Sequence, residues 1–154
     1  MDFLAVLVST FGYVGFFPIA PGTVGSMAGI GVYLLLQWMG ITSLEPFVIV
    51  VLFAAGTAVG ARAERHFRCV DPGPVVIDEV MGMLITLLWI PVGWGGLVLG
   101  FVLFRVLDIV KPFPSRRLER LPGGLGMMAD DAMAAIYANL LVRAAWRLFP
   151  GGVA

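Results

Sequence analysis

Long uncharged stretches, separated by short charged segments, most constrain what this chain can fold into. Residues 24–44 and residues 80–104 carry no charged side chain. A helix of about 20 apolar residues is long enough to cross the hydrocarbon core of a bilayer. This pattern therefore predicts helices that lie largely within a membrane.

Composition agrees with that prediction. Of the 154 residues, 60% are apolar and 13% are charged, whereas a soluble domain has about 25% charged residues. The formal net charge is zero and no basic run indicates nucleic acid as a partner. Cys69 is the single cysteine, which excludes an internal disulfide and a cysteine-based zinc site. We predict an all-α, polytopic membrane protein with about four to five transmembrane helices, a short N-terminal helix and one domain over residues 1–154.

The apolar stretches predict where the helices lie. Residues 3–17 predict a short interfacial or partly inserted helix. We expect it to be retained, because a signal peptide would have basic residues near its start and the only early charge here is Asp2. We expect spans within residues 24–44 and 47–61 and a last helix over residues 132–149.

Residues 80–104 are interrupted at 91–96 by a proline and three glycines, so one kinked span and a hairpin of two helices are both open. The arms of a hairpin, 77–91 and 95–111, would be about 22 Å and 25 Å long. Both are shorter than the hydrocarbon core of about 30 Å, so the hairpin requires a thinned bilayer or carboxylates near its surface.

We favour the hairpin because it places residues 15–26, 62–79 and 105–131 on one side of the membrane. All lysines and arginines between the spans then lie on that side, which the positive-inside rule assigns to the cytoplasm. Arg143 and Arg147 in the last helix oppose this assignment unless they reach the far interface or that helix lies shallow.

A segment rich in proline and glycine precedes the first expected span. Its sequence predicts an irregular turn over residues 15–26 with exposed backbone N–H groups, leading into a helix through Thr23 and Ser26. Such a turn could cradle an anion at a helix N-terminus. Ordinary capping by the two hydroxyls is an equally good explanation from this segment alone.

Five carboxylates lie in or beside the expected membrane helices: Asp78, Glu79, Asp108, Asp130 and Asp131. Ionisable groups at such depth are costly, which indicates a functional role. Each adjacent acidic pair is expected to open a helix, where a favourable interaction with the helix dipole is the alternative explanation. Oxygen ligands in a chain with one histidine favour Mg²⁺ over zinc.

Three charged residues are spaced to share one helix face: Arg105, Asp108 and Lys111. Two cations that flank a carboxylate suit a phosphate beside a metal ion, and Pro112 ends the helix after Lys111. Val75 stands where a cysteine phosphatase needs arginine after Cys69, no Asp-x-Asp pair is present, and His66 is the single histidine. Metal-assisted attack by water is the mechanism left.

Four blocks in this order resemble the phosphatidylglycerophosphatase A family and together extend over nearly the whole chain. They are Gly15-x-x-Pro18-x-Ala20-Pro21-Gly22-Thr23-x-Gly25-Ser26, Ile77-Asp78-Glu79-x-x-Gly82-Met83, Arg105-x-x-Asp108-Ile109-x-Lys111-Pro112-x-Pro114 and Gly124-x-Gly126-x-Met128-x-Asp130-Asp131. One departure is visible, because the family tends to have Ala-Gly where this chain has Ala134-Ala135.

The resemblance implies a Mg²⁺-dependent enzyme of the bacterial inner membrane, and the positive-inside rule assigns its site to the cytoplasmic face. The substrate would be phosphatidylglycerophosphate, a phospholipid of the bilayer, and the products phosphatidylglycerol and phosphate. A non-catalytic transporter or scaffold, and a phosphatase for another lipid phosphate, are the alternatives. The oligomeric state is open.

Residue roles follow as hypotheses within that resemblance. The metal ligands would be Glu79, Asp130 and Asp131. Asp78 or Asp108 would be a further ligand or the base, which makes the catalytic set Asp78, Glu79, Asp108 and Asp131. Phosphate contacts would come from Arg105, Lys111, Thr23 and Ser26. Arg116 and Arg117 would meet the lipid phosphodiester or anionic headgroups, or lie in solvent as loop residues.

Overall fold

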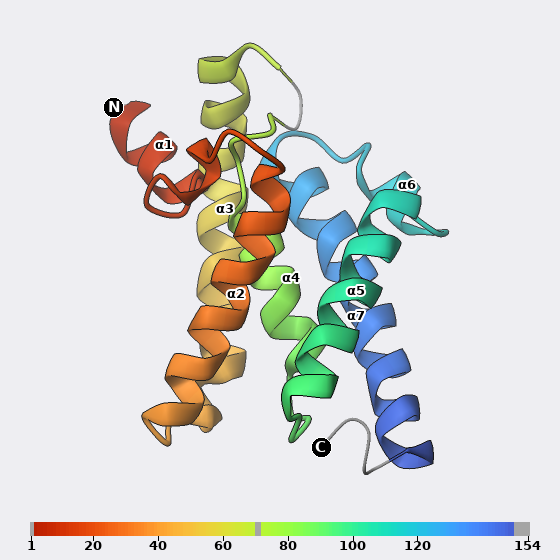
Figure 1. Ribbon diagram of the computed structural model, residues 1–154. Coiled ribbons are helices and arrows are strands. Elements are labelled where there is room, and N and C mark those ends of the chain that lie inside the picture. The colour runs from red at the N-terminus through yellow and green to blue at the C-terminus, as the bar shows by residue number, and fades with distance from the viewer. Residues whose placement is uncertain (1, 70–71, 150–154) are drawn as a thin grey trace.

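Helices are the only regular secondary structure in the computed structural model, which describes residues 2–69 and 72–149 (Figure 1). The predicted all-α class is therefore confirmed for these residues. The helices are α1 (Asp2–Ser9), η1 (Val14–Phe16), α2 (Pro21–Trp38), η2 (Thr42–Leu44), α3 (Glu45–Phe67), α4 (Ile77–Leu87), α5 (Trp94–Val110), α6 (Ser115–Leu118) and α7 (Gly124–Leu148).

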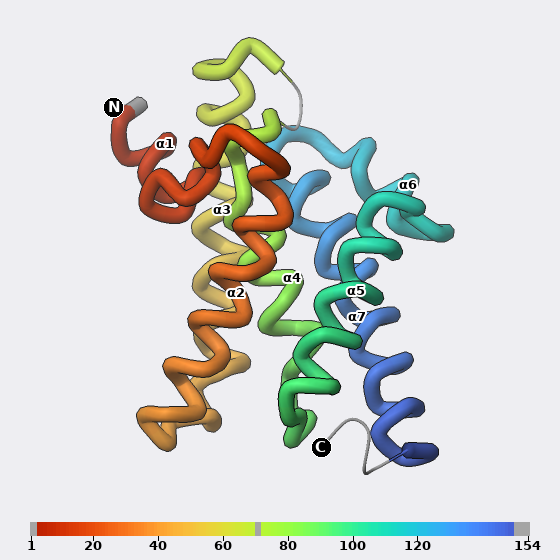
Figure 2. The backbone as a smooth tube through the Cα atoms, viewed as in Figure 1, coloured from red at the N-terminus to blue at the C-terminus, as the bar shows by residue number. Residues whose placement is uncertain are grey.

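The five longer helices run alternately down and up the molecule. In the view of Figure 2, α2, α4 and α7 descend while α3 and α5 ascend, and the short α1 and α6 lie near the top. We call the top of this view the upper end. The starts of α2, α4 and α7 and the end of α5 therefore lie at the upper end.

Helix α4 is the centre of the bundle. It packs against α2, α3, α5 and α7, and nine of its 11 residues are buried. Its core side chains include Met83, Leu84 and Leu87, which cluster with Phe104 of α5 and Ala135 of α7. The first turn of α4 is consequently surrounded by other helices, so a polar group placed there faces protein rather than open solvent.

The hairpin expected within residues 80–104 is confirmed, although its first arm is shorter than predicted. Helix α4 ends at Leu87, and Trp89 then takes a positive φ of 56° before Pro91. With 11 residues, α4 is about 16 Å long rather than 22 Å, while the 17 residues of α5 give the expected length of about 25 Å.

Glycines allow the closest helix contacts. Gly60 of α3 and Gly124 of α7 meet so closely that a Cβ on either would overlap the other's backbone. Gly82 of α4 receives the ring of Phe104, and a methyl group there would overlap it. These small residues bring the helices together where side chains would hold them apart.

Two helical segments are long and apolar enough to cross a membrane by length and composition, Thr42–Phe67 and Gly124–Leu148. The predicted number of four to five spans is not confirmed by this measure. Within the described ranges, α4 has 11 residues, which are too few for a helix to cross the hydrocarbon core, and α2 and α5 have 18 and 17 residues.

Two predicted helix starts are wrong. Helix α2 begins at Pro21, so Gly22, Thr23 and Ser26 are helical rather than part of an irregular turn. Proline is well suited to the first position of a helix, and Ala20 before it takes the left-handed conformation that ends the turn. Helix α7 begins at Gly124, so the Asp130-Asp131 pair lies nearly two turns inside the helix. Capping of the helix N-terminus therefore does not explain this pair.

Polar side chains of α7 form hydrogen bonds with the backbone at the lower end of α4. The Asn139 amide donates hydrogen bonds to the carbonyl oxygens of Ile85 and Thr86 at 3.0 Å and of Leu88 at 3.2 Å. The Arg143 guanidinium donates to the same Leu88 oxygen at 2.7 Å and to the Asn139 side chain at 2.7 Å. Asn139 and Arg143 therefore satisfy carbonyls that have no partner within α4 at its end.

Candidate functional site

Three carboxylates meet at the upper end of the bundle. One oxygen each from Asp78, Glu79 and Asp131 all lie within 4.8 Å of one another. The first two belong to the opening turn of α4, and Asp131 reaches them from α7, which packs along α4. Asp78 and Asp131 are buried and Glu79 is partly buried. Three acidic groups this close repel one another strongly unless a cation or shared protons compensate them.

Arg105 supplies one positive charge beside this cluster. Its Nη1 donates a hydrogen bond to Asp108 Oδ2 at 2.8 Å and lies 3.6 Å from Glu79 Oε1. Arg105 and Asp108 are one turn apart near the end of α5, as the predicted helix face required. The ion pair therefore holds the guanidinium at the edge of the acidic cluster.

Helix α2 approaches the site through its backbone. A Cβ on Gly22 would overlap Glu79 Oε1 and lie 3.1 Å and 3.2 Å from the two terminal nitrogens of Arg105. The absence of a side chain at Gly22 therefore leaves the space that Glu79 and Arg105 occupy. The first turn of α2 adds its positive dipole end to the same region.

Lys111 lies at the turn after α5. Its Nζ donates to Asp130 Oδ2 at 2.6 Å and to Glu119 Oε1 at 2.8 Å. Partial burial alone would lower the pKa of Lys111, but its hydrogen bonds to the carboxylates of Asp130 and Glu119 outweigh burial and hold the pKa above its ordinary value. Lys111 is therefore a permanent cation at the mouth of the site.

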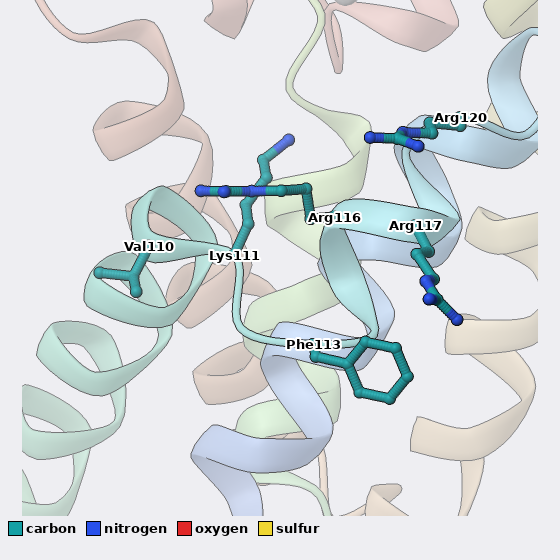
Figure 3. A pocket seen from close by; sticks show the side chains of 6 residues that line it. All are labelled: Val110, Lys111, Phe113, Arg116, Arg117 and Arg120. Atoms are coloured by element: carbon teal, nitrogen blue, oxygen red, sulfur yellow. The ribbon is translucent and has the colours of Figure 1, made fainter.

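A basic pocket adjoins Lys111. It has a volume of about 510 Å³ and is lined by Val110, Lys111, Phe113, Arg116, Arg117 and Arg120. Figure 3 shows the side chains of Arg116 and Arg120 extending toward Lys111, whereas Arg117 points the other way. The Arg117 guanidinium lies 5.0 Å from the centre of the Phe113 ring.

The carboxylate cluster fits a divalent cation. Within the part of the chain that the structure describes, Glu79 Oε2 and Asp131 Oδ2 are buried oxygens with no hydrogen-bond partner. Buried acceptors without donors are costly, and a cation would satisfy both of them. Hard carboxylate oxygens without histidine or cysteine are the ligands that Mg²⁺ prefers.

The structure brings together most of the residues proposed from the sequence. Asp78, Glu79, Asp108, Asp131 and Arg105 converge at the upper end of the bundle. Asp130 lies beside Asp131 on α7, but its Oδ2 contacts the Lys111 ammonium rather than this cluster.

The two hydroxyl residues of α2 lie differently. Ser26 is fully buried, and its Oγ donates to the Gly22 carbonyl at 2.8 Å. Thr23 is partly buried in the first turn, where its backbone N–H donates to the Ala20 carbonyl at 2.9 Å. Thr23 is therefore the nearer of the two to solvent.

Sequence reasoning missed two contributors to the site. Gly22 was read only as part of a turn, although its closeness to Glu79 depends on how α2 packs on α4. Arg120 follows Arg116 by four residues, and that spacing was the available signal for a shared surface.

The fold and the site define an all-helical protein with a cluster of carboxylates that could hold a cation, and a basic pocket at the same end. The model of the family described as Phosphatidylglycerophosphatase A matches residues 7–146. The chain belongs to this family, and it is a phosphatase.

Curated relatives agree with that assignment. A Haemophilus influenzae protein named Phosphatidylglycerophosphatase A is 40% identical over 127 residues, which are 80% of this chain and 77% of the relative. An Escherichia coli protein of the same name is 36% identical over 124 residues, 79% of this chain and 72% of the relative.

A third relative carries a different name. A Bacteroides thetaiotaomicron protein named "Putative phosphatidylinositol-3-phosphatase" is 37% identical over 151 residues, 94% of each chain. No solved structure matches this chain.

Proposed function

We propose that this enzyme hydrolyses the terminal phosphomonoester of phosphatidylglycerophosphate, with Mg²⁺ bound by Asp78, Glu79 and Asp131. The observation that carries the proposal is the meeting of these three carboxylates beside Arg105. The name of the Escherichia coli and Haemophilus influenzae relatives supports the substrate.

The residues of the site divide the work of binding and charge compensation. A bound divalent cation polarises phosphoryl oxygens and lowers the pKa of a coordinated water. Arg105, held by Asp108, would neutralise the negative charge on the phosphoryl group as it is transferred. Gly22 lets Glu79 and Arg105 approach the first turn of α2, whose dipole favours an anion at this end of the helix.

The proposal places the protein in the bacterial inner membrane as a multi-pass helical bundle. Large apolar side chains are exposed along α3, α5 and α7, among them Phe47, Val50, Val98, Val102, Leu140 and Leu141. Such continuous apolar surfaces are typical of contact with lipid. Eight lysines and arginines lie within residues 62–68 and 105–120 near the upper end, which by the positive-inside rule faces the cytoplasm together with the site.

Phosphate release from phosphatidylglycerophosphate in detergent tests the proposal. We expect release with Mg²⁺, none with EDTA, and recovery when Mg²⁺ is added back. Asp131→Asn should lower kcat by about 100-fold or more, because one ligand loses its charge. Glu64→Gln is the matched control, since it removes a carboxylate at the same end but outside the cluster.

Two results would contradict the proposal. Absence of phosphate release from the wild-type enzyme under both conditions would rule out the substrate. Wild-type turnover by Asp131→Asn at saturating Mg²⁺ would rule out the ligand assignment.

A phosphatase for phosphatidylinositol 3-phosphate is the second candidate, because the Bacteroides thetaiotaomicron relative is matched over 94% of both chains. The same assay with both lipids compares the two values of kcat/KM. We expect the higher value for phosphatidylglycerophosphate, and a higher value for the inositol lipid would reverse the choice.

A further inference from the structure

We propose that the basic pocket formed by Lys111, Arg116 and Arg120 binds the phosphodiester of the substrate lipid while the carboxylate cluster holds the phosphomonoester. This inference rests on the proposed function and extends it, because it assigns a second anionic subsite. The pocket would then select lipids that carry two phosphates over compounds that carry one.

Charge balance in the pocket calls for an anionic ligand. Four cations line it, and of these Lys111 is paired with two carboxylates, Glu119 and Asp130. Within residues 2–69 and 72–149, none of Arg116, Arg117 and Arg120 forms an ion pair. Mutual repulsion among these arginines is relieved when a phosphate lies between them.

The direction of the side chains narrows this set to two arginines. Arg116 and Arg120 extend toward Lys111, as Figure 3 shows. Arg117 points away from them, and its guanidinium is engaged by the face of Phe113 at 5.0 Å. Guanidinium groups bind phosphate through paired N–H donors, so Arg116 and Arg120 are suited to hold one group between them.

Lys111 links the pocket to helix α7. It lines the pocket, and its Nζ contacts Asp130, the neighbour of Asp131 in α7. The two phosphates of phosphatidylglycerophosphate are joined by one glycerol, so they must bind in adjacent subsites. The Lys111–Asp130 ion pair links the pocket to the helix that carries Asp131, which supports adjacent subsites.

The inference differs from a general attraction to anionic lipid. A polybasic surface acts through the potential of the bilayer and weakens when the anionic lipid is removed. A phosphodiester subsite acts on the single substrate molecule, also when that molecule is free in solution. Short-chain lipids that do not form bilayers therefore separate the two explanations.

Inhibition by the two products tests the inference. The double variant Arg116→Gln/Arg120→Gln is assayed with monomeric dihexanoylphosphatidylglycerophosphate in neutral detergent. We expect KM to rise roughly tenfold or more, with little change in kcat. The inhibition constant of dihexanoylphosphatidylglycerol, which carries only the diester, should rise by a similar factor, and that of inorganic phosphate should stay unchanged.

Arg65→Gln is the matched control, because Arg65 is an exposed arginine of α3 at the same end and outside the pocket. It should leave KM and both inhibition constants at the wild-type values. Titration calorimetry with dihexanoylphosphatidylglycerol gives the same comparison of wild type and variants without turnover.

Three outcomes would overturn the inference. The first is an unchanged inhibition constant for dihexanoylphosphatidylglycerol. The second is an equal rise for inorganic phosphate, which would place the arginines at the phosphomonoester. The third is a rise in KM that is seen only in vesicles of anionic lipid and not with the short-chain substrate. Failure of the proposed function is distinct, because it appears as absent phosphate release by the wild-type enzyme, whereas the inference concerns the ratio of variant to wild type.

Discussion

At the scale of residues, Lys111 shows how the structure divides roles that are adjacent in sequence. Asp130 and Asp131 are neighbours in α7, so their side chains leave the helix about 100° apart. Asp131 joins Asp78 and Glu79, while Asp130 faces the ammonium of Lys111. The sequence hypothesis that both aspartates bind the metal therefore becomes a proposal for one metal ligand and one partner of a lysine.

The Lys111–Asp130 pair gives a prediction about stability. Lys111→Met should lower the free energy of unfolding by about 3 kcal/mol, because it removes a cation from an almost fully buried carboxylate. Asp130→Asn in the Lys111→Met background should restore part of the loss. Thermal unfolding in detergent, followed by circular dichroism, measures both.

A matched control for this pair is Lys111→Arg, which keeps the charge and should unfold near the wild-type temperature. Equal unfolding temperatures for wild type and Lys111→Met would show that the ion pair does not stabilise the fold. A double variant less stable than Lys111→Met alone would show that Asp130 is held by other groups.

At the scale of elements, the short helix α4 depends on α7 at both ends. At the upper end, Asp131 of α7 meets the acidic first turn of α4. At the lower end, Asn139 and Arg143 of α7 donate to the carbonyls that α4 leaves unpaired. These contacts explain how a charged residue such as Arg143 lies within the last helix, since its guanidinium binds the backbone of α4.

The hydrogen bonds at the lower end of α4 predict that replacing Asn139 lowers the free energy of unfolding more than replacing a surface residue does. Asn139→Ala removes three hydrogen bonds to buried carbonyls and should lower the free energy of unfolding by about 2 kcal/mol. Arg143→Leu should have a similar effect and add little in the double variant, because the two side chains are bonded to each other.

Arg147→Leu is the control for these hydrogen bonds, since Arg147 is exposed one turn further along α7. It should unfold at the wild-type temperature in detergent. Fully additive effects of Asn139→Ala and Arg143→Leu would contradict the idea that they act as one unit.

At the scale of the whole molecule, the alternating helices gather the chemistry at one end. Helices α2, α4 and α7 begin there and α5 ends there, so segments far apart in the chain supply one site (Figure 1). The opposite end has the turn between α4 and α5 and the end of α7. This polarity is the arrangement expected of an enzyme that works at one surface of a membrane.

The polarity predicts opposite labelling of two cysteines. Native Cys69 is exposed at the upper end, and Gly95 is exposed at the lower end near the start of α5. In right-side-out vesicles, an impermeant maleimide should label Cys69→Ser/Gly95→Cys and spare the wild-type protein. In inverted vesicles the pattern should reverse. Labelling of both proteins from one side would contradict the hairpin across the membrane.

Much of the fold could be predicted because hydropathy is a local property. Uncharged stretches predicted the helices of the bundle, and Pro91 with its neighbouring glycines predicted the break between α4 and α5. The spacing of Arg105 and Asp108 predicted that they share a helix face, and the structure joins them there in an ion pair. Helix starts at Pro21 and Gly124 were missed, since glycine and hydroxyl residues disfavour a helix locally and only packing against α4 and α3 compensates for them.

The sequence by itself determined the helical class and the set of acidic and basic residues. It also indicated that these residues lie at or near the ends of helices. These features depend on hydropathy, periodicity and spacing, which act over a few turns of helix. Only the tertiary structure decided which carboxylates meet, because Asp78 and Asp131 are distant in the chain and are joined through the packing of α7 on α4. Helix packing also places Asp130 against Lys111 and brings Gly22 of α2 into contact with Glu79. It forms the basic pocket next to Lys111 as well.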